Sequence, residues 1–519
     1  MYRLGFLAIL FFTLVSFHNS LWAGPDSFAQ NTNAPCKVII AQHPVFKGRV
    51  TDPLLEIHYR RADFLDSIYG VIDQTTVKHI QSIFVYNRVN TCDSIMLIDS
   101  LSCNANQFSG KFSFKMPTIY SFEDSVSLII TVRLKPEVPL SEKIKIRISR
   151  VRFAEIPTPF NLSLAESPWT SLPVGSIVRQ LKQDGVNTYR IPGLTITNTG
   201  RLIAVFDVRY LSVWDLPGKI DIGMCYSDDQ GSTWSPMKII MHKDDEGKLH
   251  NGIGDPCILV DKQTNKIWVS AIWSKGDRTF LSSGAGLTPD ETAQWLMVSS
   301  DDNGNNWSSI ENITSQVKRP EWKLLFQGPG SGISLKNGTL VFPAQFKDET
   351  GIPSSTIVYS TDHGQHWQIG TGAWPKTTES AVAELVNGDL LLNMRDNRGD
   401  FRSLAVTSDL GKTWTRHPAS YKALIDPICM GSMISFENSK QRRMLAFSNP
   451  HTQHGRSNLA VQFSLDDGAI WPTSLMIPVD IRKFYGYSCL TYINDKLLGI
   501  IYEGKGDLLF TNIEIPVVN

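Results

Sequence analysis

The sequence lacks an excess of either charge, since its 50 Lys and Arg residues balance its 50 Asp and Glu residues. A chain of 519 residues without a basic surplus is a poor candidate for binding nucleic acid or an anionic membrane surface. Its seven cysteines include no pair with metal-ligand spacing, so we expect no metal and no other cofactor. The odd count leaves at least one cysteine unpaired, while Cys92 and Cys103 could form a local disulfide.

The sequence also lacks an apolar run that is long enough to cross a bilayer comfortably. The run "LGFLAILFFTLVSF" follows Arg3, and no further Lys, Arg, Asp or Glu appears before Asp26. This pattern is typical of a secretory signal. We therefore predict a signal peptide over residues 1–23, cleaved after Ala23. The protein is then expected to be exported, either periplasmic or secreted, and to be a monomer with no membrane span once the signal is removed.

The signatures of two common kinds of site are incomplete. The Gly-rich stretch "GPGSG" (328–332) has no Lys of a phosphate-binding loop and no helical pattern after it, which argues against phosphate binding. His250, His451 and His454 form no pair four residues apart on a helix. We expect these histidines to be loop or rim residues and not metal ligands.

What the sequence does contain is a pattern, S/T-x-D-x-G-x-x-W, that occurs five times. The copies are "SDDQGSTW" (227–234), "SDDNGNNW" (300–307), "STDHGQHW" (360–367), "TSDLGKTW" (407–414) and "SLDDGAIW" (464–471). Their first residues lie 73, 60, 47 and 57 positions apart. Periods of this size, built from short strands, are typical of a β-propeller with one hairpin-bearing blade per copy.

Each copy predicts the turn of a β-hairpin. Asp and Ser side chains bond to nearby backbone N–H groups, Gly adopts a positive φ, and Trp returns the chain to an apolar surface. Calcium binding is the alternative interpretation. A single carboxylate at the fixed position is a poor ligand set beside the several oxygens that Ca²⁺ takes. We therefore interpret the five repeated tryptophans as structural.

Residues 37–155 lack this pattern and alternate apolar with polar residues instead. Every second residue is apolar in "KFSFKMP" and along one face of "SLIITVRLK", and "KIKIRISRVRF" changes parity near Ser149, which predicts a bulge there. Period-two strands with one charged face are typical of an antiparallel sandwich. We predict a β-sandwich over residues 24–168 that serves as a carbohydrate-binding or accessory domain.

A short motif, Tyr189-Arg190-Ile191-Pro192, precedes the first repeat. Together with the five repeats, it resembles the bacterial exo-sialidases, the retaining family that removes terminal sialic acid. The resemblance covers about residues 175–515, and the preceding sandwich looks like the N-terminal domain of some exported sialidases. It implies an all-β protein whose catalytic domain, over residues 169–519, is a six-bladed β-propeller.

The resemblance implies three arginines that bind the carboxylate of the substrate. The planar guanidinium group is suited to this task because it donates two parallel hydrogen bonds to a carboxylate. The three fall on Arg190 of "YRIP", Arg395 of "LLLNMRDN" and Arg456 of "HGRSNLAV". Arg402 and Arg482 are nearby rivals, which we expect to be surface residues.

The family uses a neutral phenol as its nucleophile, a departure from the usual pair of carboxylates. A carboxylate would be repelled by the anionic substrate. The phenol falls on Tyr487 of "FYGYSCLTY", and Tyr485 and Tyr492 are expected to be core or rim aromatics. Because a phenol has a pKa of about 10, it needs a base beside it. Glu379 matches the family position, and Glu384 is the lesser candidate.

The general acid/base of the family falls on Asp215, six residues after Arg209 in "RYLSVWD". Arg209 is then assigned to the pocket around the 4-position of the sugar. Asp207 is expected to be a turn or strand residue.

Two further positions are predicted to line the sugar pocket. Asp255 of "GIGDPCILV" resembles the second pocket aspartate, which contacts the 4-hydroxyl or the N-acetyl group. Gly254 stands where the family often has Met, so one wall of the pocket differs. Trp273 is the candidate for an apolar N-acetyl pocket.

These assignments predict an exo-α-sialidase that hydrolyses terminal α-linked sialic acids of glycoproteins, glycolipids and oligosaccharides. Retention would proceed through a covalent sialosyl-tyrosine intermediate. One alternative is a trans-sialidase, which shares the catalytic residues and differs in acceptor-site aromatics that the sequence does not locate. Another is a propeller that binds sialylated glycans without cleaving them, although such a protein needs no nucleophile.

Overall fold

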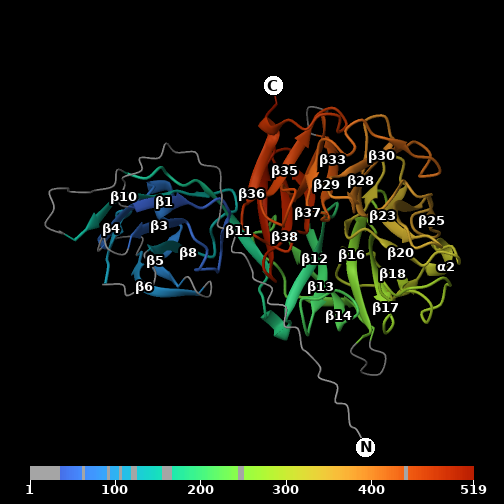
Figure 1. The fold of residues 1–519 in the computed structure, drawn as a ribbon, viewed down its shortest axis with the longest axis horizontal. Coiled ribbons are helices and arrows are strands. Elements are labelled where there is room, and N and C mark those ends of the chain that lie inside the picture. Colours follow the sequence, from blue (N-terminus) through green and yellow to red (C-terminus); the bar gives the residue numbers. More distant parts are fainter. Residues whose placement is uncertain are drawn as a thin grey trace, which may run out of the picture.

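The computed structural model describes residues 36–60, 65–89, 94–103, 108–117, 125–154, 166–243, 250–437 and 442–518. The predicted signal peptide and Cys92 lie outside these ranges, so the signal and the disulfide stay predictions. The protein is built almost entirely of strands, arranged as a smaller N-terminal part beside a larger propeller (Figure 1). In the described ranges, no helix has the length and apolar character that a membrane crossing requires.

The N-terminal part consists of two antiparallel sheets. One contains β1 (Cys36–Ile40), β3 (Leu55–Arg60), β8 (Ser125–Leu134), β5 (Ile80–Val89) and β6 (Ser94–Ser102), in that order. The other contains β10 (Ile146–Phe153), β4 (Leu65–Ile72) and β7 (Lys111–Lys115). In β7 the two phenylalanines are buried and the flanking lysines exposed, as the alternation predicts. The register shift between Ile148 and Arg150 confirms the predicted bulge.

Six sheets form the blades of the propeller, which confirms the predicted fold class. The first three blades contain β12 (Thr188–Ile196), β13 (Leu202–Arg209), β14 (Ile220–Ser227) and β15 (Lys238–Met241); β16 (Gly252–Val260), β17 (Ile267–Ser274), β18 (Gln294–Ser300) and β19 (Glu311–Asn312); and β20 (Leu324–Gln327), β22 (Ile333–Ser334), β23 (Leu340–Lys347), β24 (Pro353–Ser360) and β25 (Gln368–Ile369). The next two contain β27 (Thr377–Glu384), β28 (Leu390–Asp396), β30 (Ser403–Thr407) and β31 (Thr415–Arg416); and β33 (Ser432–Glu437), β34 (Arg443–Pro450), β35 (Leu459–Ser464) and β36 (Met476–Asp480).

The sixth blade joins distant parts of the chain. It contains β37 (Ser488–Asn494), β38 (Leu497–Glu503), β39 (Leu508–Glu514) and, from the start of the propeller, β11 (Leu172–Arg179). β11 pairs antiparallel with β39. A short strand of the N-terminal part, β2 (Val45–Phe46), pairs parallel with the other edge of β11. The N-terminal part therefore contributes a strand to a propeller sheet.

The five repeats are the turns that the sequence predicts. In the first, the Gly231 N–H donates to Ser227 Oγ at 2.8 Å, and Asp229 Oδ1 accepts from Ser227 Oγ at 2.7 Å and from Thr233 N at 2.8 Å. The same three bonds occur in the other four copies. Each Gly has a positive φ, and so does the residue before it. The Asp carboxylate of each repeat therefore stabilises the turn that contains it.

The number of repeats follows from the way the propeller closes. Each repeat joins the third strand of a blade to the fourth, as in the turn from β14 to β15. In the sixth blade the fourth strand is β11, which comes from the start of the propeller. No turn connects β39 to β11, so five repeats suffice for six blades.

Candidate active site

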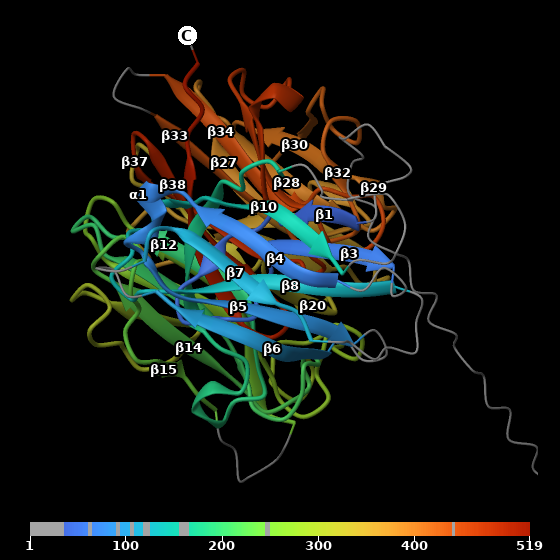
Figure 2. The ribbon, with the colours of Figure 1, turned by 90° about the vertical axis from the view of Figure 1, so that its left-hand side faces the viewer.

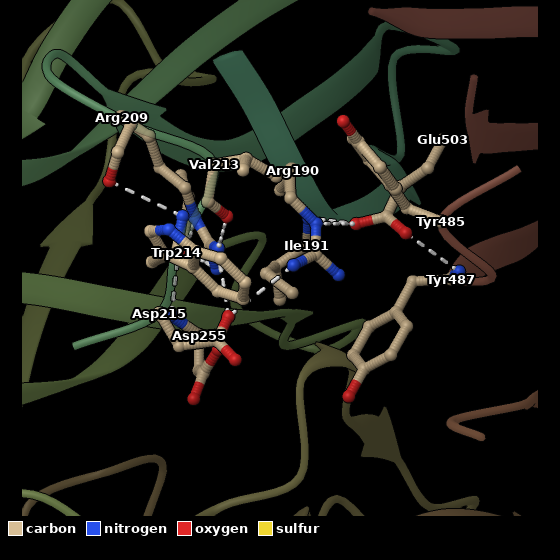
Figure 3. A network of polar contacts seen from close by, with 12 residues as sticks. Arg190, Ile191, Arg209, Val213, Trp214, Asp215, Asp255, Tyr485, Tyr487 and Glu503 are labelled. Carbon is tan, nitrogen blue, oxygen red and sulfur yellow. Dashed lines mark hydrogen bonds and ion pairs between the residues drawn. The ribbon is translucent and has the colours of Figure 1, made fainter. Parts of the chain in front are cut away.

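The predicted site residues gather where the inner strands of several blades begin. Inner strands of neighbouring blades contact one another around the propeller axis, as β12 does with β16 and β37. Arg190 lies in β12, Asp255 in β16 and Glu379 in β27, each near the first residue of its strand, and Tyr487 directly precedes β37. Figure 3 shows several of these side chains facing one another.

Tyr487 and Glu379 form the closest contact in the site. The buried phenol of Tyr487 donates a hydrogen bond to Glu379 Oε1. Arg395 Nη1 donates to Glu379 Oε2 at 2.6 Å and to the Tyr487 hydroxyl oxygen at 3.1 Å. The pairing of β27 with β28 shifts register between Thr377 and Ser380, and such an irregularity re-aims the intervening side chains.

The phenol of Tyr487 is protonated at neutral pH. Burial and the adjacent Glu379 raise its pKa well above the ordinary value, although Arg395 and Arg456 oppose the shift. Attack by the oxygen therefore requires that the proton leaves during the reaction. Glu379, which already accepts the hydrogen bond, is placed to take it.

Three guanidinium groups surround this phenol. Arg395 bonds to its oxygen, while the Cζ atoms of Arg190 and Arg456 lie 5.8 and 5.7 Å from the ring centroid. Arg456, in the loop between β34 and β35, is held by the carbonyl oxygen of Tyr485, to which its Nη1 donates at 2.6 Å. The structure thus brings together all three arginines of the predicted carboxylate clamp.

Glu503 is a site residue that the sequence analysis missed. It is fully buried at the end of β38. Its Oε1 accepts hydrogen bonds from Arg190 Nε and the Ile191 N–H, both at 3.0 Å, and its Oε2 accepts from the Tyr487 N–H at 2.9 Å (Figure 3). An acid directly after the apolar strand "LLGIIY" was the available signal, because a buried carboxylate needs such partners.

A second polar cluster contains Asp215 and Arg209. The Arg209 guanidinium is buried, lies 2.8 Å from Asp215 Oδ1, and donates to Asp207 Oδ2 at 2.8 and 3.1 Å. Asp215 is in the loop between β13 and β14, and its side chain is 75% exposed. Desolvation by neighbouring groups raises the pKa of Asp215 even at this exposure, but Arg209 and Arg190 outweigh it and lower the pKa below the ordinary value.

Asp207 lies in strand β13, one of the two places predicted for it, and it also bonds to two residues of the site. Its Oδ1 accepts from the Asp255 N–H at 2.9 Å, and Arg209 holds its other oxygen. Burial raises the pKa of Asp207 to about 6, against the effect of Arg209. Burial and the charge of Asp207 also raise the pKa of Asp255. Arg209 opposes the shift at both carboxyl groups, but it bonds directly only to Asp207.

The loop that carries Asp215 packs against Gly254 at ordinary van der Waals distances. A Cβ atom at Gly254 would lie 3.4 Å from the Leu216 side chain and 3.5 Å from Asp207 Oδ2. Leu216 follows Asp215 and therefore occupies this wall of the site. A Cβ at Gly252 would lie only 2.2 Å from the Gly218 carbonyl oxygen, so the loop rests directly on β16.

Two aromatic residues differ in their accessibility. Trp273 is only 6% exposed and packs with Ile222, Met241 and Ile253 between the first two blades. Its assignment to the N-acetyl pocket stays a prediction. Trp214, which directly precedes Asp215, is 77% exposed and lies beside the polar groups of the site (Figure 3).

The expectation that Arg402 and Arg482 are surface residues is wrong. Arg402 is fully buried, where its Nε donates to Asn393 Oδ1 at 2.7 Å and its Nη1 to the Cys429 carbonyl. Arg482 is only 23% exposed and pairs with Asp480 at 2.6 Å. The partners of Arg402 lie 9 and 27 positions away, and Arg482 also bonds to Asp52, 430 positions away, so the local sequence does not reveal these contacts. Neither contacts Tyr487 in the described hydrogen bonds and ion pairs.

Two rival residues, Glu384 and Tyr492, lie away from this arrangement, whereas the ring centroid of Tyr485 lies 5.0 Å from Arg190 Cζ. Glu384 is at the far end of β27 from Glu379, where it accepts from the Lys336 N–H at 3.2 Å. Tyr492 donates to Asp495 at 2.5 Å. Within the described residues, no three His, Cys, Asp or Glu side chains gather as a metal site would require.

The chain is similar to several known proteins. Residues 216–501 match the family described as a BNR repeat-like domain. The chain is 42% identical over 385 residues to a sialidase of Bacteroides fragilis, covering 72% of this chain and 70% of that protein. It is 30% identical to a sialidase of Micromonospora viridifaciens over 64% of this chain and 52% of that protein. The solved structure of Hadza microbial sialidase Hz136 has a TM-score of 0.84 at 34% identity and covers 92% of this chain and 99% of its own.

Proposed function

Because the chain belongs to the sialidase family of glycoside hydrolases, we propose that it releases terminal α-linked sialic acids with retention of configuration. Glycoproteins, glycolipids and oligosaccharides are the proposed substrates. The observation that carries the proposal is the convergence of Glu379 and three arginines on the single phenol of Tyr487. A protein that only bound sialylated glycans would have no need for a phenol paired with a proton acceptor.

The arginines account for the recognition of the substrate. Sialic acid carries a carboxylate on its anomeric carbon, and the planar guanidinium group binds a carboxylate through paired hydrogen bonds. Arg190, Arg395 and Arg456 surround Tyr487, so a carboxylate held by them brings the anomeric carbon to the phenol oxygen. An uncharged nucleophile is favoured at this place because a second anion would be repelled.

The reaction then proceeds in two balanced steps. In the first, the Tyr487 oxygen bonds to the anomeric carbon and its proton passes to Glu379. The bond to the aglycone breaks, and Asp215 protonates the departing oxygen. In the second, Asp215 takes a proton from water, whose oxygen bonds to the anomeric carbon. The bond to Tyr487 breaks, and the phenol recovers its proton from Glu379.

Asp215 must be protonated to act as the acid, yet Arg209 and Arg190 lower its pKa in the free protein. Binding of the substrate resolves this conflict in part. The substrate carboxylate neutralises Arg190, which lies 3.4 Å from Asp215 Oδ1, and adds negative charge nearby. Both effects raise the pKa of Asp215.

The remaining polar residues are assigned to the sugar hydroxyl and N-acetyl groups. The raised pKa of Asp255 favours a protonated carboxyl group that can donate a hydrogen bond, while Arg209 offers a fixed cation beside Asp215. Trp273 is proposed to back the N-acetyl pocket. We further propose that the protein is exported as a monomer and that residues 24–168 form an accessory domain.

Stereochemistry and one pair of variants test the mechanism. With a sialoside substrate, the product that appears first in a proton NMR time course should be the α-anomer. Tyr487→Phe should retain the arginines, bind a sialic-acid analogue as well as before, and turn over at least 1,000-fold more slowly, roughly the loss of a central catalytic group. Tyr485→Phe is the matched control and should stay within about threefold of the unmutated enzyme. Initial release of the β-anomer would exclude a single covalent intermediate.

Trans-sialidase activity is the second candidate, and Trp214 favours it. This indole is exposed beside Asp215, the group that would protonate the departing sugar. An aromatic face at this position can stack on the sugar that leaves, or on one that enters in its place. Incubating the enzyme with a sialoside and lactose distinguishes the two activities. Formation of sialyllactose that Trp214→Ala abolishes would support transfer, whereas release of free sialic acid alone supports hydrolysis.

A further inference from the structure

Five charged residues are enclosed where the N-terminal part meets the propeller, and none belongs to the proposed chemistry. Arg482 Nη1 donates to Asp52 at 2.8 Å, and Arg482 Nη2 donates to Asp480 at 2.6 Å. Arg49 pairs with Asp507 and lies 3.5 Å from Asp52. All five side chains are at most 23% exposed. Arg49 and Asp52 belong to the segment between β1 and β3, residues 41–54, hereafter the β1–β3 segment.

Stability alone does not account for this cluster. Enclosing ions costs several kcal/mol each, and well-packed apolar residues can replace a buried ion pair without loss (on the order of 1–4 kcal/mol gain). The junction already has apolar contacts, since Phe46 is fully buried against Tyr502 and β2 pairs with β11. Charged groups have fixed directional partners, which apolar contacts lack. An enclosed charge cluster at this junction therefore suits precise placement of the two parts more than added stability.

The loop that carries Tyr487 is attached to the β1–β3 segment at its first residues. This Tyr487 loop comprises residues 481–487, between β36 and β37. The Ile481 N–H donates to the Gln42 carbonyl at 3.1 Å, and the next side chain, Arg482, pairs with Asp52. The loop then runs directly to the phenol. The N-terminal part thus fixes the point at which this loop begins.

Glu503, which bonds to the backbone of Tyr487, is also connected to the β1–β3 segment. Glu503 accepts from the Tyr487 N–H, and the Glu503 N–H donates to the Tyr487 carbonyl at 3.0 Å. Glu503 opens the turn from β38 to β39, in which the Gly504 N–H donates to the Asp507 carbonyl at 2.9 Å. The carboxylate of Asp507 pairs with Arg49. Both supports therefore end on the β1–β3 segment.

We propose that the β1–β3 segment positions the nucleophile, with Asp52 and Arg49 as positioning residues. The inference rests on the proposed role of Tyr487 as nucleophile. It gives part of the N-terminal domain a function in catalysis on every substrate, in addition to any glycan binding. Figures 1 and 2 show the N-terminal sheets beside the blade that contains β11, β38 and β37. A shift of about 1 Å at the reacting oxygen slows such a reaction roughly 100-fold.

Full-length variants that remove one charge test the proposal. Asp52→Asn and Asp507→Asn are close to isosteric and each break one attachment. Lys47→Met is the matched control, because Lys47 lies in the same segment and donates across the junction to Ser232 Oγ at 2.7 Å, far in the chain from Tyr487. The readouts are the rate at which 2,3-difluorosialic acid labels the enzyme, the KM and kcat for an aryl sialoside, and the melting temperature.

We expect both Asp variants to label at least tenfold more slowly and to lose kcat in the same proportion, with KM within about threefold. The Lys47→Met variant should be labelled at the rate of the unmutated enzyme, even if its melting temperature falls as far as those of the Asp variants. Equal labelling rates in all variants, or an equal slowing in Lys47→Met, would overturn the proposal. If the Asp52→Asn variant does not fold, the labelling rate of the Asp507→Asn variant alone tests the proposal. A label on a residue other than Tyr487 in the unmutated enzyme would refute the proposed nucleophile itself.

Discussion

Replacing Glu503 by Gln should damage both stability and catalysis. The carboxylate accepts three hydrogen bonds, from Arg190 Nε, the Ile191 N–H and the Tyr487 N–H. A Gln side chain has one acceptor oxygen, so its amide NH₂ must face one of these donors. Losing one bond to a charged group costs about 1.5–3 kcal/mol, and breaking a buried ion pair about 3–5 kcal/mol. Asp215 remains near Arg190, so we expect the lower part of this range, about 3 kcal/mol.

The effect on activity follows from what Glu503 holds. It bonds to one arginine of the clamp and to the backbone of the nucleophile, so both lose a support in the variant. We expect kcat/KM for an aryl sialoside to fall about 100-fold, as for a displacement of about 1 Å. Denaturant unfolding measures the loss of stability. Glu514→Gln is the control, because Glu514 is 68% exposed, and it should change stability by less than about 0.5 kcal/mol. Full activity in Glu503→Gln would show that the carboxylate is not needed.

Three further predictions concern separate parts of the molecule. Trp367→Ala should lower the free energy of unfolding by about 3–5 kcal/mol and Trp414→Ala by less, since Trp367 is buried and Trp414 is not, with KM unchanged in either folded protein. The pKa of Asp409 is lowered from 3.8 to about 2 by its bonds within the repeat, so its stabilising effect is present above about pH 4 and is lost as the pH falls towards 2. The difference in melting temperature between the unmutated protein and Asp409→Asn should therefore shrink over that interval, and a constant difference would contradict the assignment. Asp215→Asn should slow sialyllactose hydrolysis far more than hydrolysis of an aryl sialoside, whose leaving group needs no proton; equal losses would argue against an acid role.

The features that the sequence predicted correctly depend on local chemistry. The repeated turns are determined by residues within eight positions, such as Ser227 and Asp229, so their bonds could be derived from one copy. The bulge near Ser149 is also local, because a change of parity must be absorbed where it occurs. The resemblance to sialidases then supplied the residues of the site, and the structure brings Tyr487, Glu379 and the three arginines together.

The features that the sequence did not reveal depend on contacts between distant segments. Glu503 lies 313 positions from Arg190, and nothing near either residue indicates that they pair. Arg402 resembles a surface residue in the polar stretch around it, yet it is buried against Asn393. The bond between Asp52 and Arg482 spans 430 positions and joins two predicted domains. Charge and burial at such positions follow from the tertiary structure and not from local pattern.

The most direct test of the mechanism is to identify the residue that carries the sugar during the reaction. The unmutated enzyme is incubated with 2,3-difluorosialic acid, whose fluorine at C3 slows the second step, and the labelled protein is digested and mapped by mass spectrometry. A sialosyl-tyrosine intermediate predicts a single adduct on Tyr487, in the peptide that contains "FYGYSCLTY". An adduct on Tyr485, on Glu379 or on another carboxylate would contradict it.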